Sequence, residues 1–416
     1  SLPYTAVAFE RGVFAMYSWS RGLFPALVLL LAMLLCLPAR AAEQAPILLA
    51  LDAEFGHTTS TSAQAVQQGI EIAIDEINRA GGVLGGRKLQ LVTSDNRSIP
   101  AIAVDNLREH ASNPNVVAVF GGKFSPTYME LLPAVHELGI LLLDPWGSAD
   151  GITDHRYQPS YTFRLSLKDA WAGPALLQFA RDERKASKVG VLLPNTAWGR
   201  SNQAAIAQAA PGLKMSIVGQ HWYNWGDASL LTQYRALREA GAQAIILVAN
   251  ETEGSLLVRE LAALPANERL PIVSHWGVTG GDFVRMSGDA LQAVDFSVIQ
   301  TYSFIGNASP AAKRVLAALK QRYGVESAER VKSPVGIAHA YDLTHLLAKA
   351  ITRAGSADRG KVRVAMEQLG PYDGLVQRYA KPFSADRHDA LSPANIFMAR
   401  YGADDLLKPL NRRNAH

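Results

Sequence analysis

The chain has 416 residues, of which 48% are hydrophobic and 19% charged, and its formal net charge at pH 7 is +4. This is the composition of an ordinary globular protein, and the length favours two domains. The basic residues form no run with interleaved aromatic residues, so nothing in the sequence indicates nucleic-acid binding. The single cysteine, Cys36, excludes an internal disulfide and any metal site built from several cysteines.

An apolar run near the start of the chain, LFPALVLLLAMLLCL at Leu23–Leu37, predicts an export signal. The run is shorter than the ~20 residues that a membrane-spanning helix needs, and Ala39 and Ala41 supply the small side chains of a signal-peptidase site. We therefore expect residues 1–41 to be a cleaved signal peptide with an upstream extension, a mature start near Ala42, and a periplasmic location. An uncleaved membrane anchor is the alternative.

From Pro46 onward, short β-branched or Leu-rich runs alternate with amphipathic stretches of helical period, a pattern typical of βαβ units and a parallel sheet. The first helix carries Ile70, Ile74 and Ile77 on one face and is stopped by the pair Gly81–Gly82. The first set of predicted strands is Pro46–Asp52, Lys88–Asp95, Val116–Gly122 and Ile140–Pro145.

A second set of strands begins after Arg164 and predicts a second open α/β sheet. Long helical patterns follow at Ala311–Tyr323 and Val335–Ala354. The segment GPYDGLVQRY at 370–379 comes next, and we interpret it as a strand that crosses between two lobes. The second set of predicted strands is Lys188–Pro194, Leu213–Gln220, Ala244–Asn250, Pro271–Trp276 and Ala293–Gln300.

The loops at the carboxyl ends of these strands are the candidate ligand site, because open parallel sheets bind ligands there. In GGKFSPT, after the third strand, Ser125 is predicted to be a helix N-cap with Pro126 at the first helical position. The free N–H groups of such a helix start favour an anion or a carboxylate. Ser125 acting only as a cap is the alternative, and the position is compatible with both roles.

The loop DPWGSADG, after the fourth strand, adds three candidates. Trp146 is expected to form a wall of a pocket, Gly147 permits close approach of the backbone, and Ser148 offers a hydroxyl group.

Loops of the second set supply four more candidates: Trp198 in NTAWGRS, Asn250 and Glu251 in VANETEG, and Trp276 in SHWGVTGG. One tryptophan is more often partly buried core than ligand wall, but several at strand ends favour a binding site. HWYNW at His221–Trp225 adds a further aromatic candidate.

The sequence contains no P-loop, GxSxG elbow or HExxH motif, and its glycine clusters lack the spacing of a dinucleotide site. His339 and His345 are off a common helical face and are interpreted as packing residues. We therefore predict no enzyme activity, no catalytic residue, no cofactor and no metal ion. A secreted enzyme that uses Glu251 or Asp144 as acid or base is the alternative, but no partnered nucleophile accompanies either.

Four segments together resemble a known family: GIEIAIDEINRAGGVLGGRKLQLVTSDNRSIPAIAVDNLREH, VVAVFGGKFSPTYMELLPAVHELGILLLDP, KVGVLLPNTAWGRS and VGIAHAYDLTHLLAKAITRAG. The chain is similar, over nearly all of Pro46 to Leu410, to the leucine/isoleucine/valine-binding type of periplasmic receptor that serves ABC transporters. This resemblance implies α/β architecture with two Rossmann-like lobes, each with a parallel sheet, and three crossovers near Leu165, Tyr302 and Val376. The implied boundaries are 42–165 plus 303–375 for lobe 1, 166–302 plus 376–412 for lobe 2, and 413–416 for a tail.

The resemblance also implies roles for single residues in a cleft between the lobes. Ser125 matches the serine that binds the ligand carboxylate, and Trp146 and Ser148 fall on the next ligand-binding loop. Trp198 stands where relatives use an aromatic residue to cover the ligand, and Asn250 lies near another contact of lobe 2.

One position departs from the family pattern, because Trp276 stands where amino-acid binders carry an acid for the ligand ammonium. Glu251 replacing that acid is one interpretation, and Trp198 and Trp276 holding a cation through cation–π attraction is another. A third is an uncharged or carboxylate aromatic ligand. The implied partners are a small-molecule ligand and the membrane permease of an ABC importer, or alternatively a signalling receptor that reads the closed form. We expect a monomer.

Overall fold

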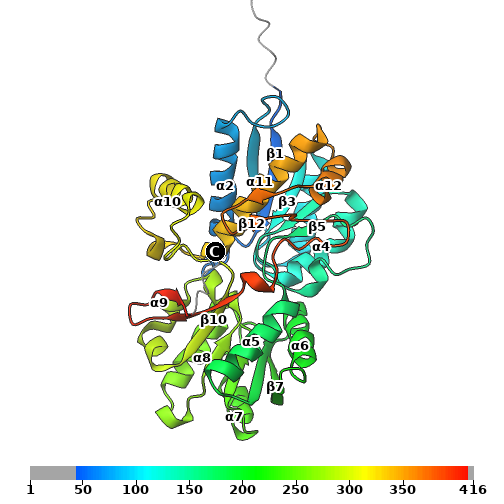
Figure 1. Ribbon diagram of the computed structural model, residues 1–416. Helices are drawn as coiled ribbons and strands as arrows, with labels where there is room; N and C mark the ends of the chain where they lie inside the picture. The colour runs from blue at the N-terminus through cyan, green and yellow to red at the C-terminus, as the bar shows by residue number, and fades with distance from the viewer. Residues whose placement is uncertain (1–43, 411–416) are drawn as a thin grey trace, which may run out of the picture. The chain divides into compact units, whose positions relative to one another are not determined.

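The computed structural model describes residues 44–410, and the first of its two main sheets is parallel throughout. Its strand order is β2-β1-β3-β4-β5, and it occupies the upper half of Figure 1. The predicted signal peptide at 1–41 and tail at 413–416 lie outside the described residues. The strands are β1 (Ile47–Ala53), β2 (Leu89–Asp95), β3 (Val116–Gly121), β4 (Leu141–Asp144) and β5 (Thr162–Arg164).

Helices from both halves of the chain pack around this sheet (Figure 1). The closest approach is between α2 and α11, where a Cβ atom at Gly69 would lie 2.3 Å from the backbone oxygen of Ile337. Only glycine permits this contact. The helices are α2 (Ser62–Arg79), α3 (Pro100–Ser112), α4 (Ser125–Leu138), α10 (Pro310–Tyr323), α11 (Pro334–Ala354) and α12 (Arg359–Glu367).

The second sheet has the strand order β14-β13-β10-β9-β8-β6-β7. Its central strands are parallel, whereas β13 is antiparallel to β10 and β14 is antiparallel to β13, so the C-terminal segment extends this sheet. The strands are β6 (Lys188–Pro194), β7 (Ser216–Tyr223), β8 (Ala244–Leu247), β9 (Ile272–Ser274), β10 (Phe296–Gln300), β13 (Phe397–Tyr401) and β14 (Leu407–Pro409). The helices around it are α5 (Asp169–Glu183), α6 (Ala197–Ala209), α7 (Leu231–Glu239), α8 (Glu251–Ala262) and α9 (Phe283–Ser287).

The structure also contains short 3₁₀ turns, and two of them flank the site described below. These two are η1 (Asp150–Ile152) and η3 (Trp276–Gly280). The others are η2 (Ala266–Glu268), η4 (Gly288–Ala293), η5 (Ala328–Arg330) and η6 (Pro393–Asn395).

All nine predicted strands occur in the two α/β sheets, with differences of up to three residues at their ends. The strand predicted at Leu213–Gln220 begins later, at Ser216, because the chain turns through Lys214 with a φ of 54°. The strands predicted to end at Asn250 and Trp276 stop at Leu247 and Ser274, since helical turns begin at both loops. Strands β5, β13 and β14 were not predicted.

The interpretation of 370–379 as one crossing strand is wrong. The segment forms a small antiparallel hairpin, β11 (Tyr372–Asp373) with β12 (Arg378–Tyr379). The carboxylate of Asp342 in α11 fixes the turn by accepting bonds from the backbone N–H groups of Leu375 (2.7 Å) and Val376 (2.9 Å).

The chain passes between the two sheets after β5, after β10 and after β12, and a buried ion-pair network joins two of these passages. Arg164, with no exposed surface, donates from Nε to Asp389 (2.6 Å), and Lys168 donates to the same carboxylate (3.0 Å). Although burial opposes ionisation, these two cations lower the pKa of Asp389 to about 2. The network stabilises the connection between the lobes without touching the cavity.

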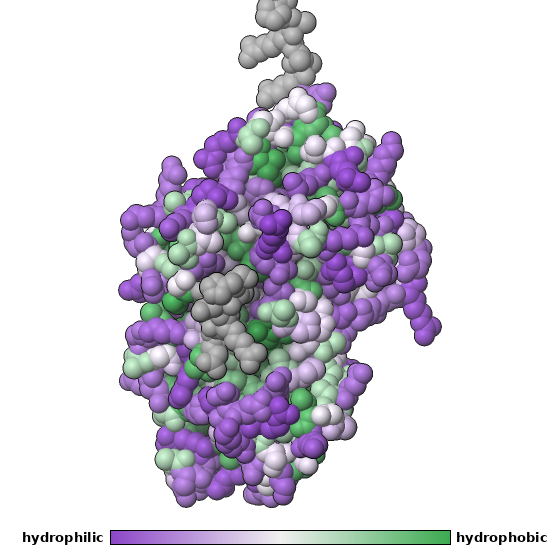
Figure 2. All heavy atoms as spheres, in the orientation of Figure 1, coloured by the Kyte–Doolittle hydropathy of each residue, from purple (hydrophilic) through white to green (hydrophobic). Residues whose placement is uncertain are grey.

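The exterior is mainly hydrophilic on the face shown in Figure 2, with only small separate hydrophobic areas. Large exposed hydrophobic side chains within residues 44–410 are Ile99, Tyr157, Val364 and Leu410. No helix in this range combines the length and apolarity needed to cross a membrane.

Candidate functional site

The carboxyl ends of strands from both sheets meet around one small cavity. The first sheet contributes the loops after β3 and β4, and the second contributes the loops after β6, β7, β8 and β9. The cavity has a volume of about 10 Å³, which is room for about one water molecule. Its lining is Lys123, Phe124, Ser125, Pro126, Trp146, Ser148, Trp198, Trp225, Asn250, Trp276 and Gly277.

Ser125 lies in the cavity wall, but the prediction that it caps α4 is wrong. Phe124 is the N-cap, and Ser125 is already the first helical residue. Its hydroxyl oxygen instead accepts bonds from the backbone N–H groups of Ser148 and Ala149, both at 3.2 Å. The side chain therefore joins the two ligand-facing loops of the first lobe.

Asp144, the last residue of β4, holds the second of these loops in place. One of its carboxylate oxygens accepts bonds from the backbone N–H groups of Trp146 (2.9 Å) and Gly147 (2.6 Å). Burial raises the pKa of Asp144 to about 7, against the opposing effect of the nearby Arg164. The carboxyl group is a structural support of the loop and does not line the cavity.

Two tryptophans from opposite lobes contact each other across the cleft. Trp146 and Trp276 are each 1% exposed, and their ring centroids lie 5.6 Å apart. Trp276 also lies 5.8 Å from the ring of His339, which is buried and bonded to Pro145 and Thr301. Burial lowers the pKa of His339 to about 4, which supports its interpretation as a packing residue.

The other two tryptophans of the cavity carry polar atoms without partners. The indole Nε1 atoms of Trp198 and Trp225 are buried and have no hydrogen-bond acceptor among the described residues. Trp198 packs edge-on against His275 at 5.0 Å, and Trp225 packs edge-on against Phe124 at 5.3 Å. A buried N–H group without an acceptor is unfavourable by about 1–3 kcal/mol, so an acceptor that reached either atom would remove this cost.

One residue of the cavity wall, Lys123, belongs to a buried ion pair between the lobes. Lys123 Nζ lies 2.7 Å from Glu251 Oε2, and both side chains are 1% exposed. Lys123 also donates to the backbone oxygen of Gly280 (3.2 Å), and Thr59 donates to the other oxygen of Glu251 (3.0 Å). Both carboxylate oxygens of Glu251 thus accept hydrogen bonds from lobe-1 side chains, and Glu251 is not part of the cavity wall.

Backbone bonds reinforce this contact between the lobes. The N–H group of Thr61 donates to Gly280 (2.9 Å), that of Asp282 donates to Thr59 (3.0 Å), and that of Asp150 donates to the hydroxyl of Ser201 (2.9 Å). The two lobes are closed against each other in this structure.

Six of the predicted site residues meet at the cavity: Ser125, Trp146, Ser148, Trp198, Asn250 and Trp276. Gly147 does not line it, because a Cβ atom there would instead meet Ile152 (2.8 Å) and Tyr128 (2.9 Å) in the lobe core. Glu251 lies behind Lys123. A role of these eight residues in ligand binding stays a prediction.

Sequence reasoning missed Lys123, Phe124 and Gly277 as site residues, although the first two lie in the same GGKFSPT loop as Ser125. The position of Lys123, directly after a predicted buried strand, was the available signal. The predicted aromatic segment His221–Trp225 reaches the cavity through Trp225 alone.

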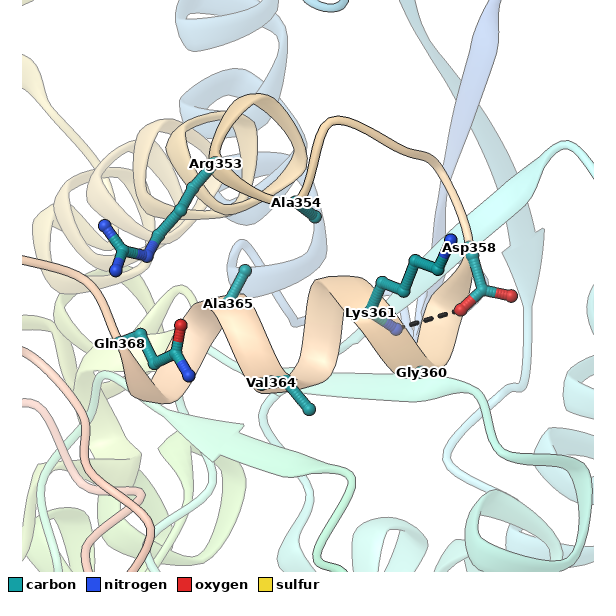
Figure 3. Close-up of a pocket in the computed structure, with 8 residues that line it drawn as sticks. All are labelled: Arg353, Ala354, Asp358, Gly360, Lys361, Val364, Ala365 and Gln368. Carbon is teal, nitrogen blue, oxygen red and sulfur yellow. Dashed lines mark hydrogen bonds between the residues drawn. The ribbon is translucent and has the colours of Figure 1, made fainter.

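A larger pocket of about 600 Å³ lies between the end of α11 and α12 (Figure 3), but it is a poor candidate. Its cations, Arg353 and Lys361, are exposed, and Asp358 serves as the N-cap of α12 by accepting from the backbone N–H of Lys361. Within residues 44–410 there is also no group of three or more His, Cys, Asp or Glu residues that would hold a metal ion.

The two-lobed fold with a cavity between the lobes defines a small-molecule binding protein of periplasmic receptor architecture. A model of the periplasmic binding protein family matches residues 53–404, and the chain belongs to this family. Its relatives include a leucine-, isoleucine-, valine-, threonine- and alanine-binding protein of Pseudomonas aeruginosa, 25% identical over 72% of this chain and 76% of that protein.

Solved structures show the same fold. A type 1 periplasmic binding protein from Bordetella pertussis has a TM-score of 0.77 at 20% identity and covers 88% of this chain and 99% of its own. A branched-chain amino acid transporter substrate-binding protein from Streptococcus pneumoniae, in complex with isoleucine, has a TM-score of 0.73 at 22% identity, with 88% and 99% coverage. The predicted fold class and family are confirmed.

Proposed function

We propose that the chain is the periplasmic substrate-binding component of an ABC-type importer, which captures a small organic solute by closure of its two lobes. The observation that supports this most is the cavity, because its wall is contributed by strand-end loops of both sheets. Relatives named for branched-chain amino acids point to the same class of function. The proposal includes export by cleavage of residues 1–41, a monomeric state and an interaction of the closed form with a membrane permease.

In the proposed mechanism, the solute first docks on lobe 1, against Ser125, Trp146 and Ser148. Closure then brings Trp198 and Trp276, with Asn250, over the solute from lobe 2. The moving bodies are residues 42–165 plus 303–375 and residues 166–302 plus 376–412. A ligand drives closure only through the contacts that it gains in the closed form, and a change from 1:99 to 99:1 requires about 5.5 kcal/mol of such contacts.

The solute class within this proposal is an amino acid, or an aromatic, carboxylate or amide-like compound. Four tryptophans line the cavity, so apolar and aromatic solutes gain large contact areas on closure. The proposal includes no turnover, because no side chain of the cavity wall forms a nucleophile–base pair.

The test is a screen of amino acids, aromatic acids, amides and polyamines against protein that starts at Ala42. We expect one compound class to raise the melting temperature and to change tryptophan fluorescence with one-to-one stoichiometry. Mass spectrometry of the bound compound should return it unchanged, and a converted product would refute the proposal.

A further inference from the structure

The chemistry of the cavity wall is unbalanced between hydrogen-bond donors and acceptors. Lys123 is the cation of the wall, and its ammonium group has three N–H bonds. Two of them have acceptors, at Glu251 (2.7 Å) and at the backbone oxygen of Gly280 (3.2 Å). One N–H of Lys123 therefore has no acceptor among the described residues.

Two further donors share this condition, namely the buried indole N–H groups of Trp198 and Trp225. Trp198 is only 5% exposed and lies in the wall of the same cavity. All three residues line the cavity, and they come from three separate loops. A ligand group with several acceptor lone pairs could accept hydrogen bonds from all three N–H groups.

Three helices also direct their N-termini to this space. Ser125 is the first residue of α4, Trp198 is the second residue of α6, and Asn250 is the N-cap of α8. The partial positive charge at each helix start favours an anion. These helix starts give the cavity a positive potential, and the ion pair of Lys123 with Glu251 adds no net charge to it.

No acid in the wall offsets this potential, since the lining contains no aspartate or glutamate. Two carboxylates beside Lys123 are already used, and the first is Glu251, which binds Lys123 and Thr59. Glu54 accepts bonds from Ser62, from Ser60 (3.3 Å) and from the backbone N–H of Lys123 (3.3 Å). A ligand ammonium would find no anionic partner in the cavity wall, and leaving it buried and unpaired is strongly unfavourable.

We propose that this site takes small monocarboxylates with an apolar or aromatic body and no ammonium group, and that Lys123 is the residue that determines this specificity. The inference rests on the proposed function and narrows its solute class. The carboxylate accepts from the free N–H of Lys123 and from the indole N–H groups, and Phe124, Trp146 and Trp276 enclose the body. Since the cavity has room for about one water molecule in this closed form, a bound solute must hold the lobes further apart than they are here.

The first test compares matched compounds by isothermal titration calorimetry: 4-methylpentanoate, leucine and 4-methylpentanamide, and the set 3-phenylpropionate, phenylalanine and 3-phenylpropanamide. Within each set the body is constant, and only the ammonium or the carboxylate changes. We expect at least one acid to bind at least tenfold more tightly than its amino acid and its amide. Equal or tighter binding of the amino acid or the amide overturns the ligand class but leaves the proposed function intact.

Absence of binding by all six compounds also overturns the ligand class. The wider screen described under the proposed function then tests that function separately. Binding of any other solute would still support a solute-binding protein.

The second test uses Lys123→Met, which keeps the length of the side chain and removes its charge. We expect at least a tenfold loss of affinity for the acid that binds. Because this change leaves Glu251 without its partner, the double variant Lys123→Met/Glu251→Gln is measured beside it. The double variant buries no unpaired charge and should still lose at least tenfold in affinity. Lys361→Met, at the exposed cation of the pocket in Figure 3, is the matched control and should keep wild-type affinity. Wild-type affinity in the double variant would overturn the role of Lys123.

Discussion

The indole N–H of Trp198 is the most informative single group, because it is buried, has no acceptor within residues 44–410 and belongs to a side chain that lines the cavity. We predict that Trp198→Phe lowers ligand affinity by at least tenfold, since a hydrogen bond to a charged group is worth about 1.5–3 kcal/mol. Trp171→Phe, in α5 and outside the cavity lining, is the control and should leave affinity unchanged. Fluorescence titration of both variants measures the difference, and equal affinities would remove this N–H group from the site.

Asp144 makes stability depend on pH, because burial raises its pKa from 3.8 to about 7. When the pKa of a carboxyl group is higher in the folded than in the unfolded protein, its contribution to the free energy of unfolding is largest at a pH below the unfolded-state pKa. For Asp144 this contribution is lost as the pH rises through 7. Asp144→Asn keeps an oxygen for the backbone bonds of Trp146 and Gly147 and carries no charge.

We therefore predict that the variant gains free energy of unfolding relative to wild type, by roughly 3 kcal/mol, between pH 5 and pH 8. Urea unfolding at both pH values measures this change. The control is Asp182→Asn at an exposed aspartate, for which the difference from wild type should not grow with pH. A constant difference for Asp144→Asn would contradict an uncharged Asp144 in the folded protein.

At the scale of elements, the contact of α2 with α11 fixes the frame that carries the loops of lobe 1. A methyl group at Gly69 would meet the backbone oxygen of Ile337 at 2.3 Å, and backbone of a long helix cannot move aside cheaply. We predict that Gly69→Ala lowers the free energy of unfolding by about 1–3 kcal/mol, the usual effect of overpacking. Gly370→Ala, where a Cβ atom meets nothing within 4 Å, is the control and should change the unfolding midpoint little.

Strands and their ligand-facing loops could be predicted from the sequence because both depend on short segments. Hydrophobic periodicity marks β6 at its true bounds, and the positions of Trp146 and Trp198 after strands place both at the cavity. The extra strand β13 could not be predicted in the same way, since it pairs antiparallel with β10, which is far away in the chain. Strand β14 is only three residues long and pairs with β13.

Contacts between distant residues were beyond sequence reasoning. Lys123 and Glu251 are 128 positions apart, and nothing local to either reveals that one neutralises the other. Ser125 shows a second limit, because a serine before a proline suits an N-cap, yet the nearby N–H groups of Ser148 and Ala149 compete for its oxygen. Which ligand the site accepts therefore depends on which side chains contact each other in the folded protein, and not only on which residue types occur in the loops.

At the scale of the whole molecule, the Lys123–Glu251 pair links lobe closure to charge. In the closed form, Lys123→Met leaves the carboxylate of Glu251 buried without its cation, which is unfavourable by about 3–5 kcal/mol. In an open form both positions are hydrated, so the penalty falls on the closed form alone. We predict that ligand-free Lys123→Met has a larger radius of gyration than wild type by small-angle X-ray scattering.

The double variant Lys123→Met/Glu251→Gln should recover the smaller radius of gyration, because it buries no unpaired charge. Arg108→Gln, which breaks an exposed ion pair with Glu137 inside lobe 1, serves as the control and should not change the radius. If the single variant stays as compact as wild type, the pair does not contribute to closure.

The contact of Trp146 with Trp276 also gives the protein an optical signature of its own state. Two indole rings 5.6 Å apart and inclined at 46° couple their excited states, and the two rings belong to different lobes. Opening separates the chromophores, so near-ultraviolet circular dichroism should lose the coupled signal when the lobes part and regain it on closure. The molecule thereby carries a built-in, label-free gauge of lobe separation that can be followed in real time.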